Sequence, residues 1–248
     1  MTTSAATVYF VLGTPDSGRR AIVDDIIANG LDADTRVLVL RAESEDTAPA
    51  DATIAERANV EVRTWTWDGT TLPELELPGG STVFFLAESR GDPMQQLEAL
   101  KPWLAQRHAE LARVLCVVDC QLAEKTPALA PWFDACIHFS DVVFLTKRDG
   151  VANKWLSGFI RRYEEQFYPC LFIQVKKTGL PNPALVLEPQ PRRVSQYFDE
   201  EEFAAPIEIE TDDEEDDEDD DLTPPEPYFE RNRSGRRVKE LPDIRQFV

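Results

Sequence analysis

The stretch Gly-Thr-Pro-Asp-Ser-Gly-Arg-Arg, residues 13–20, decides how the fold of this chain is interpreted. It follows a short apolar run and precedes a helix-like segment. Gly13 and Gly18 have the spacing of a phosphate-binding loop, G-x-x-x-x-G-K-[ST], which joins a strand to a helix. Arg19 and Arg20 stand where that pattern has lysine and a hydroxyl residue. The stretch therefore predicts a strand–loop–helix unit whose phosphate-binding loop is altered.

Outward from this loop, β-rich runs alternate with helix-like stretches over the first 180 residues. Several runs, such as Val83-Phe84-Phe85-Leu86, are continuously apolar, which is typical of strands buried on both faces of a parallel sheet. We predict strands at 7–12, 36–41, 60–66, 82–87, 113–119, 141–146 and 170–175, and helices at 20–29, 94–110, 127–138 and 152–166. The alternation predicts an α/β fold of three layers with a mainly parallel sheet.

Polar motifs follow three of the predicted strands, where ligands bind in open α/β sheets. Glu88 begins one of them, and its carboxylate could orient a water molecule or sense a phosphate. Asp119 ends the next strand, and Lys147 and Asp149 follow a third. An aspartate can accept hydrogen bonds from the edge of guanine, while a lysine stem covers the face of the base. The order of these motifs predicts a nucleotide site at one edge of the sheet.

Together these motifs resemble the CobW/HypB/UreG family of P-loop GTPases and metallochaperones, and CobW-like members most closely. The family's E-T-x-G-x-A-D-P motif is matched by Glu88, Gly91 and Pro93, and its N-K-x-D motif by Lys147 and Asp149. The resemblance extends over roughly residues 7–175.

The resemblance implies a P-loop NTPase-like fold that binds guanine nucleotide, either GTP or GDP. The residues that it assigns are Gly13, Ser17, Gly18, Arg19 and Arg20 for the phosphates, Lys147 and Asp149 for the guanine base, and Glu88 for catalysis.

The departures from the family pattern bear on catalysis. Arg19 replaces the loop lysine, and the two side chains are not equivalent in a tight loop. Arg20 replaces the threonine whose hydroxyl would bind Mg²⁺, which argues against Mg²⁺-dependent hydrolysis. Thr146 replaces the asparagine of N-K-x-D, and the family's C-x-C-C metal motif is absent.

Two functional hypotheses follow from these observations. The first is a CobW-like protein that binds guanine nucleotide with weak or no GTP hydrolysis. The second is a catalytically dead pseudo-GTPase that acts as a protein-interaction module. Each motif also has a simpler interpretation as an ordinary β–α turn or a solvated loop at a strand end.

The composition changes after residue 180, where several prolines break regular structure. Residues 212–221 are ten consecutive acidic residues, which predict a disordered tail. We therefore predict a nucleotide-binding domain at 1–180, followed at 181–248 by a Pro-rich linker, the acidic tail and a short basic segment. Residues 191–248 hold −12 of the net charge of −20. This charge argues against nucleic-acid binding and leaves two interpretations of the tail, a solvated segment or a contact with a basic protein partner.

The rest of the sequence excludes other classes of protein. No apolar run approaches the length of a membrane span, and the N-terminus lacks the basic region of a signal peptide, so we predict a cytoplasmic protein without membrane contact. The four cysteines form no C-x-x-C pair, and the two histidines have no spaced partner. Buried free thiols are therefore expected, and no metal site.

Overall fold

The computed structural model describes residues 4–199 and 226–248 of the chain. The acidic run at 212–221 lies outside the described residues. Two compact units are distinguished, one formed by Met1–Val194 with Leu241–Val248 and the other by Ser195–Glu240. The domain boundary predicted at residue 180 therefore falls within the first unit.

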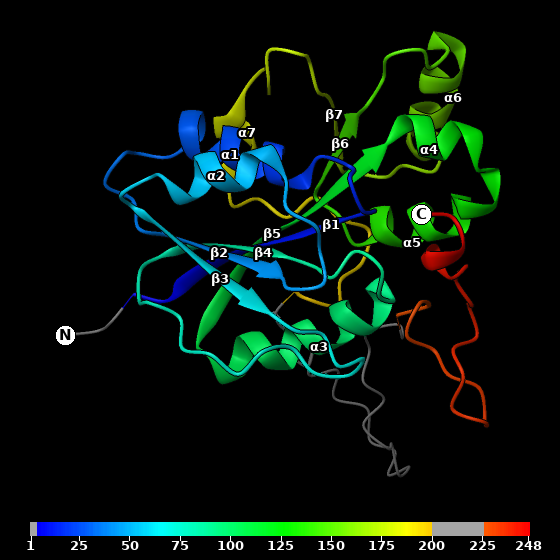
Figure 1. Ribbon diagram of the computed structural model, residues 1–248. Coiled ribbons are helices and arrows are strands. Elements are labelled where there is room, and N and C mark those ends of the chain that lie inside the picture. Colours follow the sequence, from blue (N-terminus) through cyan, green and yellow to red (C-terminus); the bar gives the residue numbers. More distant parts are fainter. Residues whose placement is uncertain (1–3, 200–225) are drawn as a thin grey trace, which may run out of the picture. The chain divides into compact units, whose positions relative to one another are not determined.

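The first unit is built on one seven-stranded sheet in which every pairing is parallel (Figure 1). The strand order is β3-β2-β4-β1-β5-β6-β7. The strands are β1 (Ala6–Gly13), β2 (Val37–Ala42), β3 (Val60–Trp65), β4 (Thr82–Leu86), β5 (Ala109–Asp119), β6 (Val142–Thr146) and β7 (Leu171–Gln174). The prediction of an α/β fold with a mainly parallel sheet is confirmed, and all seven predicted strands are present.

Helices cover both faces of the sheet, because its strands are apolar on both sides. They are α1 (Arg19–Gly30), α2 (Pro49–Ala55), α3 (Pro93–Gln106), α4 (Cys120–Lys125), α5 (Ala130–His138), α6 (Asn153–Glu164) and α7 (Pro183–Leu187), with single 3₁₀ turns η1 (Pro127–Leu129) and η2 (Ile244–Gln246). One face of the sheet packs against α1, α2 and α7 through Ile22, Ile54 and Val186. On the other face, Phe85 of β4 meets Trp103 of α3 with ring centroids 5.0 Å apart.

The structure corrects the predicted helices in two respects. The helix predicted at 94–110 ends at Gln106, since His108 adopts a positive φ of 48° and β5 begins at Ala109. The short helices α2, α4 and α7 were not predicted, because five to seven residues hold too few turns to display a helical period.

All four cysteines are free and buried, as expected. Among the described residues, no helix is long and apolar enough to cross a membrane. The second unit contains an isolated antiparallel bridge between Arg231 and Arg237 and a ring contact of 4.6 Å between Tyr197 and Phe229.

Candidate functional site

Parallel pairing gathers the predicted motifs at one edge of the sheet. Gly13 ends β1 and pairs with Val117 of β5, while Thr146 ends β6 and pairs with Asp119. Glu88 follows β4, which lies on the other side of β1. The carboxyl ends of the four strands β4, β1, β5 and β6 therefore frame the candidate site.

The loop after β1 is shaped by positive φ angles. Gly13 has φ 150°, and a Cβ added there would lie 2.8 Å from the carbonyl oxygen of Val117, so only glycine fits. Asp16 and Gly18 also have positive φ, at 56° and 94°. Thr146 holds the loop from β6, because its hydroxyl donates to the carbonyl oxygen of Ser17 at 2.7 Å.

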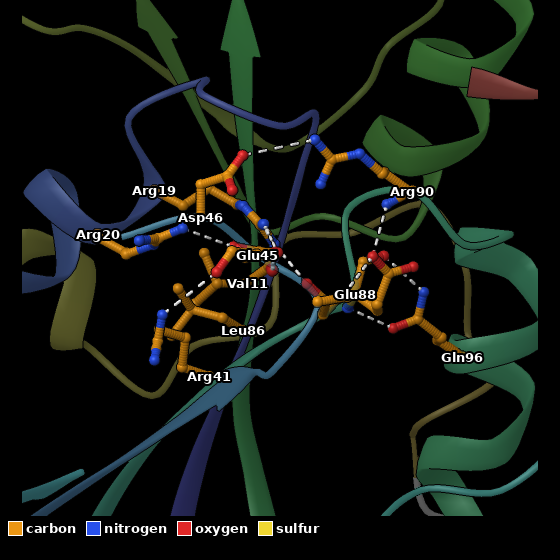
Figure 2. A network of polar contacts seen from close by, with 12 residues as sticks. Val11, Arg19, Arg20, Arg41, Glu45, Asp46, Leu86, Glu88, Arg90 and Gln96 are labelled. Atoms are coloured by element: carbon orange, nitrogen blue, oxygen red, sulfur yellow. Dashed lines mark hydrogen bonds and ion pairs between the residues drawn. The ribbon is translucent and has the colours of Figure 1, made fainter. Parts of the chain in front are cut away.

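Arg19, at the position of the loop lysine, points beneath the loop toward the ends of β1 and β4 (Figure 2). Its side chain is 4% exposed. One guanidinium nitrogen donates to the carbonyl oxygens of Ala87 at 2.5 Å and Val11 at 3.4 Å. The other forms an ion pair with Glu45. All of these contacts are internal to the protein.

Arg20 pairs with two carboxylates, one of which is that of Glu45. Its guanidinium pairs with Glu45 at 3.1 Å and with Asp51 at 2.6 Å. Asp51 also accepts from the backbone N–H of Ala48, which caps the start of α2. Burial raises the pKa of Glu45, but the positive charges of Arg19 and Arg20 outweigh it, and the pKa is lowered.

Glu88 is fixed by contacts with its own loop and with the loop after β2. Its carboxylate accepts from the hydroxyl of Ser44 at 3.0 Å and from the backbone N–H of Arg90 at 3.1 Å. Gln96 of α3 bonds both backbone groups of Glu88, at 2.7 and 2.9 Å. The side chain is buried, and Figure 2 shows it turned toward Gln96 and Arg90, away from Arg20.

Lys147 and Asp149 lie at the β6 end of the same edge. The Lys147 ammonium is 2.9 Å from the carboxylate of Asp119, whose other oxygen caps α4 by accepting from Leu122 N–H. Asp149 is 76% exposed and pairs with the exposed Lys177 at 3.0 Å. Lys147 is thus anchored to the sheet edge, whereas the Asp149 carboxylate lies in solvent.

The structure brings most of the predicted residues to one edge of the sheet, but it adds partners that the sequence did not indicate. Glu45 and Asp51 supply the negative charges that Arg19 and Arg20 require. A signal was present for Glu45, which follows β2 by three residues much as Glu88 follows β4. Two adjacent arginines beside a buried strand also require nearby carboxylates.

A cavity of about 310 Å³ lies outside the loop. Its lining includes residues 16–21, Glu45 and residues 48–50. The hydroxyls of Thr14 and Ser17 are buried and have no hydrogen-bond partner among the described residues. Among the same residues, no group of three histidine, cysteine, aspartate or glutamate side chains could hold a metal ion.

The side chains of this cavity do not fit a magnesium-bound nucleotide triphosphate. The charges of Arg19 and Arg20 are balanced by Glu45 and Asp51, and Asp16 adds a further carboxylate. Polyphosphate is attracted by positive charge at the loop, and here both arginines already pair with carboxylates.

Comparison with known proteins gives similarity of fold. No protein-family model matches the chain, and no curated protein matches it. The Zn(II)-bound YjiA GTPase from E. coli is 14% identical, with a TM-score of 0.44 over 76% of this chain and 66% of that chain. FtsY, a cell division protein from Thermotoga maritima, is 18% identical, with a TM-score of 0.46 over 75% and 68%.

A third solved structure is the signal recognition particle receptor FtsY from Elizabethkingia anophelis. It is 18% identical, with a TM-score of 0.38 over 63% of this chain and 54% of that chain. The chain thus spans 66% of the length of YjiA and about half of this FtsY. Such identities and TM-scores indicate similarity of fold alone.

Proposed function

We propose that this chain is a CobW-like pseudo-GTPase, a P-loop type of protein that does not hydrolyse GTP and acts as a protein-interaction module. The observation that supports this proposal is the position of Glu45. Its carboxylate engages Arg19 and Arg20, the two loop cations that would otherwise meet a phosphate.

The buried ion pair makes this arrangement difficult to reverse. The side chains of Arg19 and Glu45 are both 4% exposed. Separating such a pair while its members stay buried costs about 3–5 kcal/mol, because each charge loses its partner in a poorly solvated environment. An incoming phosphate must therefore displace Glu45 before it gains a contact with Arg19.

The residues expected to support hydrolysis are also engaged elsewhere. Arg20 has no hydroxyl to offer a metal ion and is bound to two carboxylates. Glu88 is buried and accepts two hydrogen bonds from Ser44 and Arg90. Both side chains are thus already held by protein partners.

A second candidate function is weak binding of guanine nucleotide without hydrolysis. The unpartnered hydroxyls of Thr14 and Ser17 favour it, because both lie in the loop at the start of α1 and can donate to an anion. In this alternative the stem of Lys147 covers the base and Asp149 reads its edge. Mg²⁺ takes no part.

The test uses fluorescent GDP and GTP with and without Mg²⁺, together with phosphate release from GTP. We expect release at the buffer background, no Mg²⁺-dependent binding, and no change on Glu88→Gln. Steady GTP hydrolysis that disappears in Glu88→Gln would contradict the pseudo-GTPase proposal.

The second candidate has a separate signature in the same titrations. Saturable, Mg²⁺-independent binding of GDP that is stronger than binding of ADP and is weakened by Asp149→Asn would support it. Asp46→Asn is the matched control, because Asp46 is a similarly exposed carboxylate whose contact with Arg90 is 4.0 Å long.

A further inference from the structure

The C-terminal eight residues belong to the first unit although 46 residues of the second unit, Ser195–Glu240, precede them. Ile244 is 2% exposed, so Leu241–Val248 is docked on the first unit. The segment ends beside α5 (Figure 1). Trp132 of α5 and residues 241–245 line the same cavity. The segment is therefore a peptide bound in cis.

The docked segment is folded on itself. Asp243 accepts from the N–H of Arg245 at 3.1 Å and pairs with its guanidinium at 2.8 Å. Gln246 and Phe247 donate backbone N–H groups to Asp243 and Ile244. Among the described residues, every hydrogen bond found for this segment lies within it. Burial of Ile244 and electrostatic attraction therefore hold it in place, and both are available to another peptide.

The segment borders a cavity of about 640 Å³, and we call this cavity, together with the surface that the segment covers, the C-terminal groove. The groove is lined by the loops after β2, β3 and β4, by α3 and α5, and by the segment itself: Ser44, residues 66–69, Glu88, residues 90–93, Gln95, Trp132 and residues 241–245. Trp67 and Trp132 supply apolar surface, and the buried Nε1–H of Trp132 has no acceptor among the described residues.

The groove has an excess of negative charge. Apart from the segment, its charged residues are Asp68, Glu88, Asp92 and Arg90. Arg245 is 69% exposed where it lines the groove, and its guanidinium pairs with Asp243 of the segment, to which Glu88 of the groove adds a weaker attraction. Carboxylates beside tryptophan rings are suited to a cationic side chain, because the ring face and the carboxylate both attract positive charge.

We propose that the C-terminal groove is a docking site for a partner peptide in which an aliphatic residue is followed by arginine, and that Leu241–Val248 is its internal competitor. The aliphatic residue replaces Ile244 and the arginine replaces Arg245. This inference rests on the proposed interaction function and names the site through which it acts.

The test uses a fluorescent peptide with the sequence of Leu241–Val248 and the full chain, followed by anisotropy. Ile244→Asp in the chain removes the internal competitor. We expect this variant to bind the peptide at least about tenfold more tightly than the unchanged chain, because a tethered competitor acts at an effective concentration in the millimolar range. Val248→Asp is the matched control, since Val248 is 46% exposed and the same charge is added.

Peptide variants identify the anchors. A peptide with Asp at the position of Ile244, or Glu at the position of Arg245, should lose most of its binding to the Ile244→Asp chain. Equal binding by the unchanged, Ile244→Asp and Val248→Asp chains would overturn the proposal, as would equal binding of all peptides.

A second measurement covers the case in which Ile244→Asp disturbs folding. In the unchanged chain, excess peptide should accelerate hydrogen exchange at the amides of Gln246 and Phe247, and unaltered exchange at saturating peptide would overturn the proposal. Neither experiment contains nucleotide. GTP turnover with intact peptide exchange would therefore refute the pseudo-GTPase function alone.

Discussion

Glu45 is the residue on which the chemistry of the loop depends. Its carboxylate pairs with both Arg19 and Arg20, which stand where a nucleotide-binding loop has lysine and a hydroxyl residue, and Asp51 supplies the second negative charge. The glycine spacing of this loop matches a phosphate-binding pattern, but its two positive charges are balanced within the protein. Glu45, which contacts both arginines, lies 25 positions beyond Arg20 in the chain.

Glu45→Gln removes the negative charge that Arg19 and Arg20 share. We expect the free energy of unfolding to fall by about 3 kcal/mol, because Arg19 is left buried without its counter-charge. Sulfate or phosphate should restore part of the loss by binding to the folded state. Urea denaturation with and without these anions measures both effects.

The control for this variant is Glu43→Gln, since Glu43 is exposed and, among the described residues, its carboxylate accepts a hydrogen bond only from the hydroxyl of Thr66. It should change stability by less than about 0.5 kcal/mol. If Glu43→Gln and Glu45→Gln are equally mild, the ion-pair arrangement does not stabilise the fold.

The lowered pKa of Glu45 also predicts a pH dependence. Because the folded-state pKa lies below the unfolded value near 4.5, the stabilisation is present above that pH and is lost as the pH falls through the folded-state pKa. The stability difference between the unchanged chain and Glu45→Gln should therefore shrink below pH 4.5. A difference that stays constant would contradict this prediction.

At the scale of elements, the crossing from β1 to α1 depends on glycine. The loop passes so close to β5 that a Cβ on Gly13 would lie 2.8 Å from Val117 O and 2.9 Å from Ser17 Oγ. The close approach lets Thr146 of β6 hold the loop through Ser17. Three strands, β1, β5 and β6, therefore determine the path of the loop.

Gly13→Ala should lower the free energy of unfolding by about 2–3 kcal/mol, because the methyl group overpacks the β1–β5 contact. Chemical denaturation measures the change. Gly158→Ala is the control, since Gly158 lies in α6 with open space around the added Cβ, and it should stabilise the protein by up to about 1 kcal/mol. Similar effects at both positions would contradict the packing argument.

At the scale of the whole molecule, charge is distributed unevenly. Residues 191–248 hold −12 of the net −20, and residues 212–221 supply ten of the acidic groups. We propose a basic protein partner for this acidic run. The C-terminal groove is a separate candidate site, which also favours a cationic peptide. We expect the acidic run and the groove both to bind positively charged partners, but only the groove requires an aliphatic residue as well.

A labelled decalysine peptide separates the two. Binding of decalysine should weaken steeply with added salt, because exposed charges are screened within about 10 Å at 0.1 M ionic strength. Replacing the acidic residues at 212–221 by their amides should abolish that binding and leave capture of the Leu241–Val248 peptide unchanged. Undiminished decalysine binding by the amide variant would refute a role for the acidic run.

The sequence by itself determined the sheet and the loop. The alternation of β-rich runs with helix-like stretches predicted all seven strands, several of them as continuously apolar runs that are buried on both faces, and glycine spacing placed the β1–α1 turn. Tertiary structure alone decided that Glu45 pairs with Arg19 and Arg20, and that Ile244 is buried in the first unit. Ion pairing and burial between distant segments leave no periodicity in a sequence, because they depend on where the sheet brings those segments together.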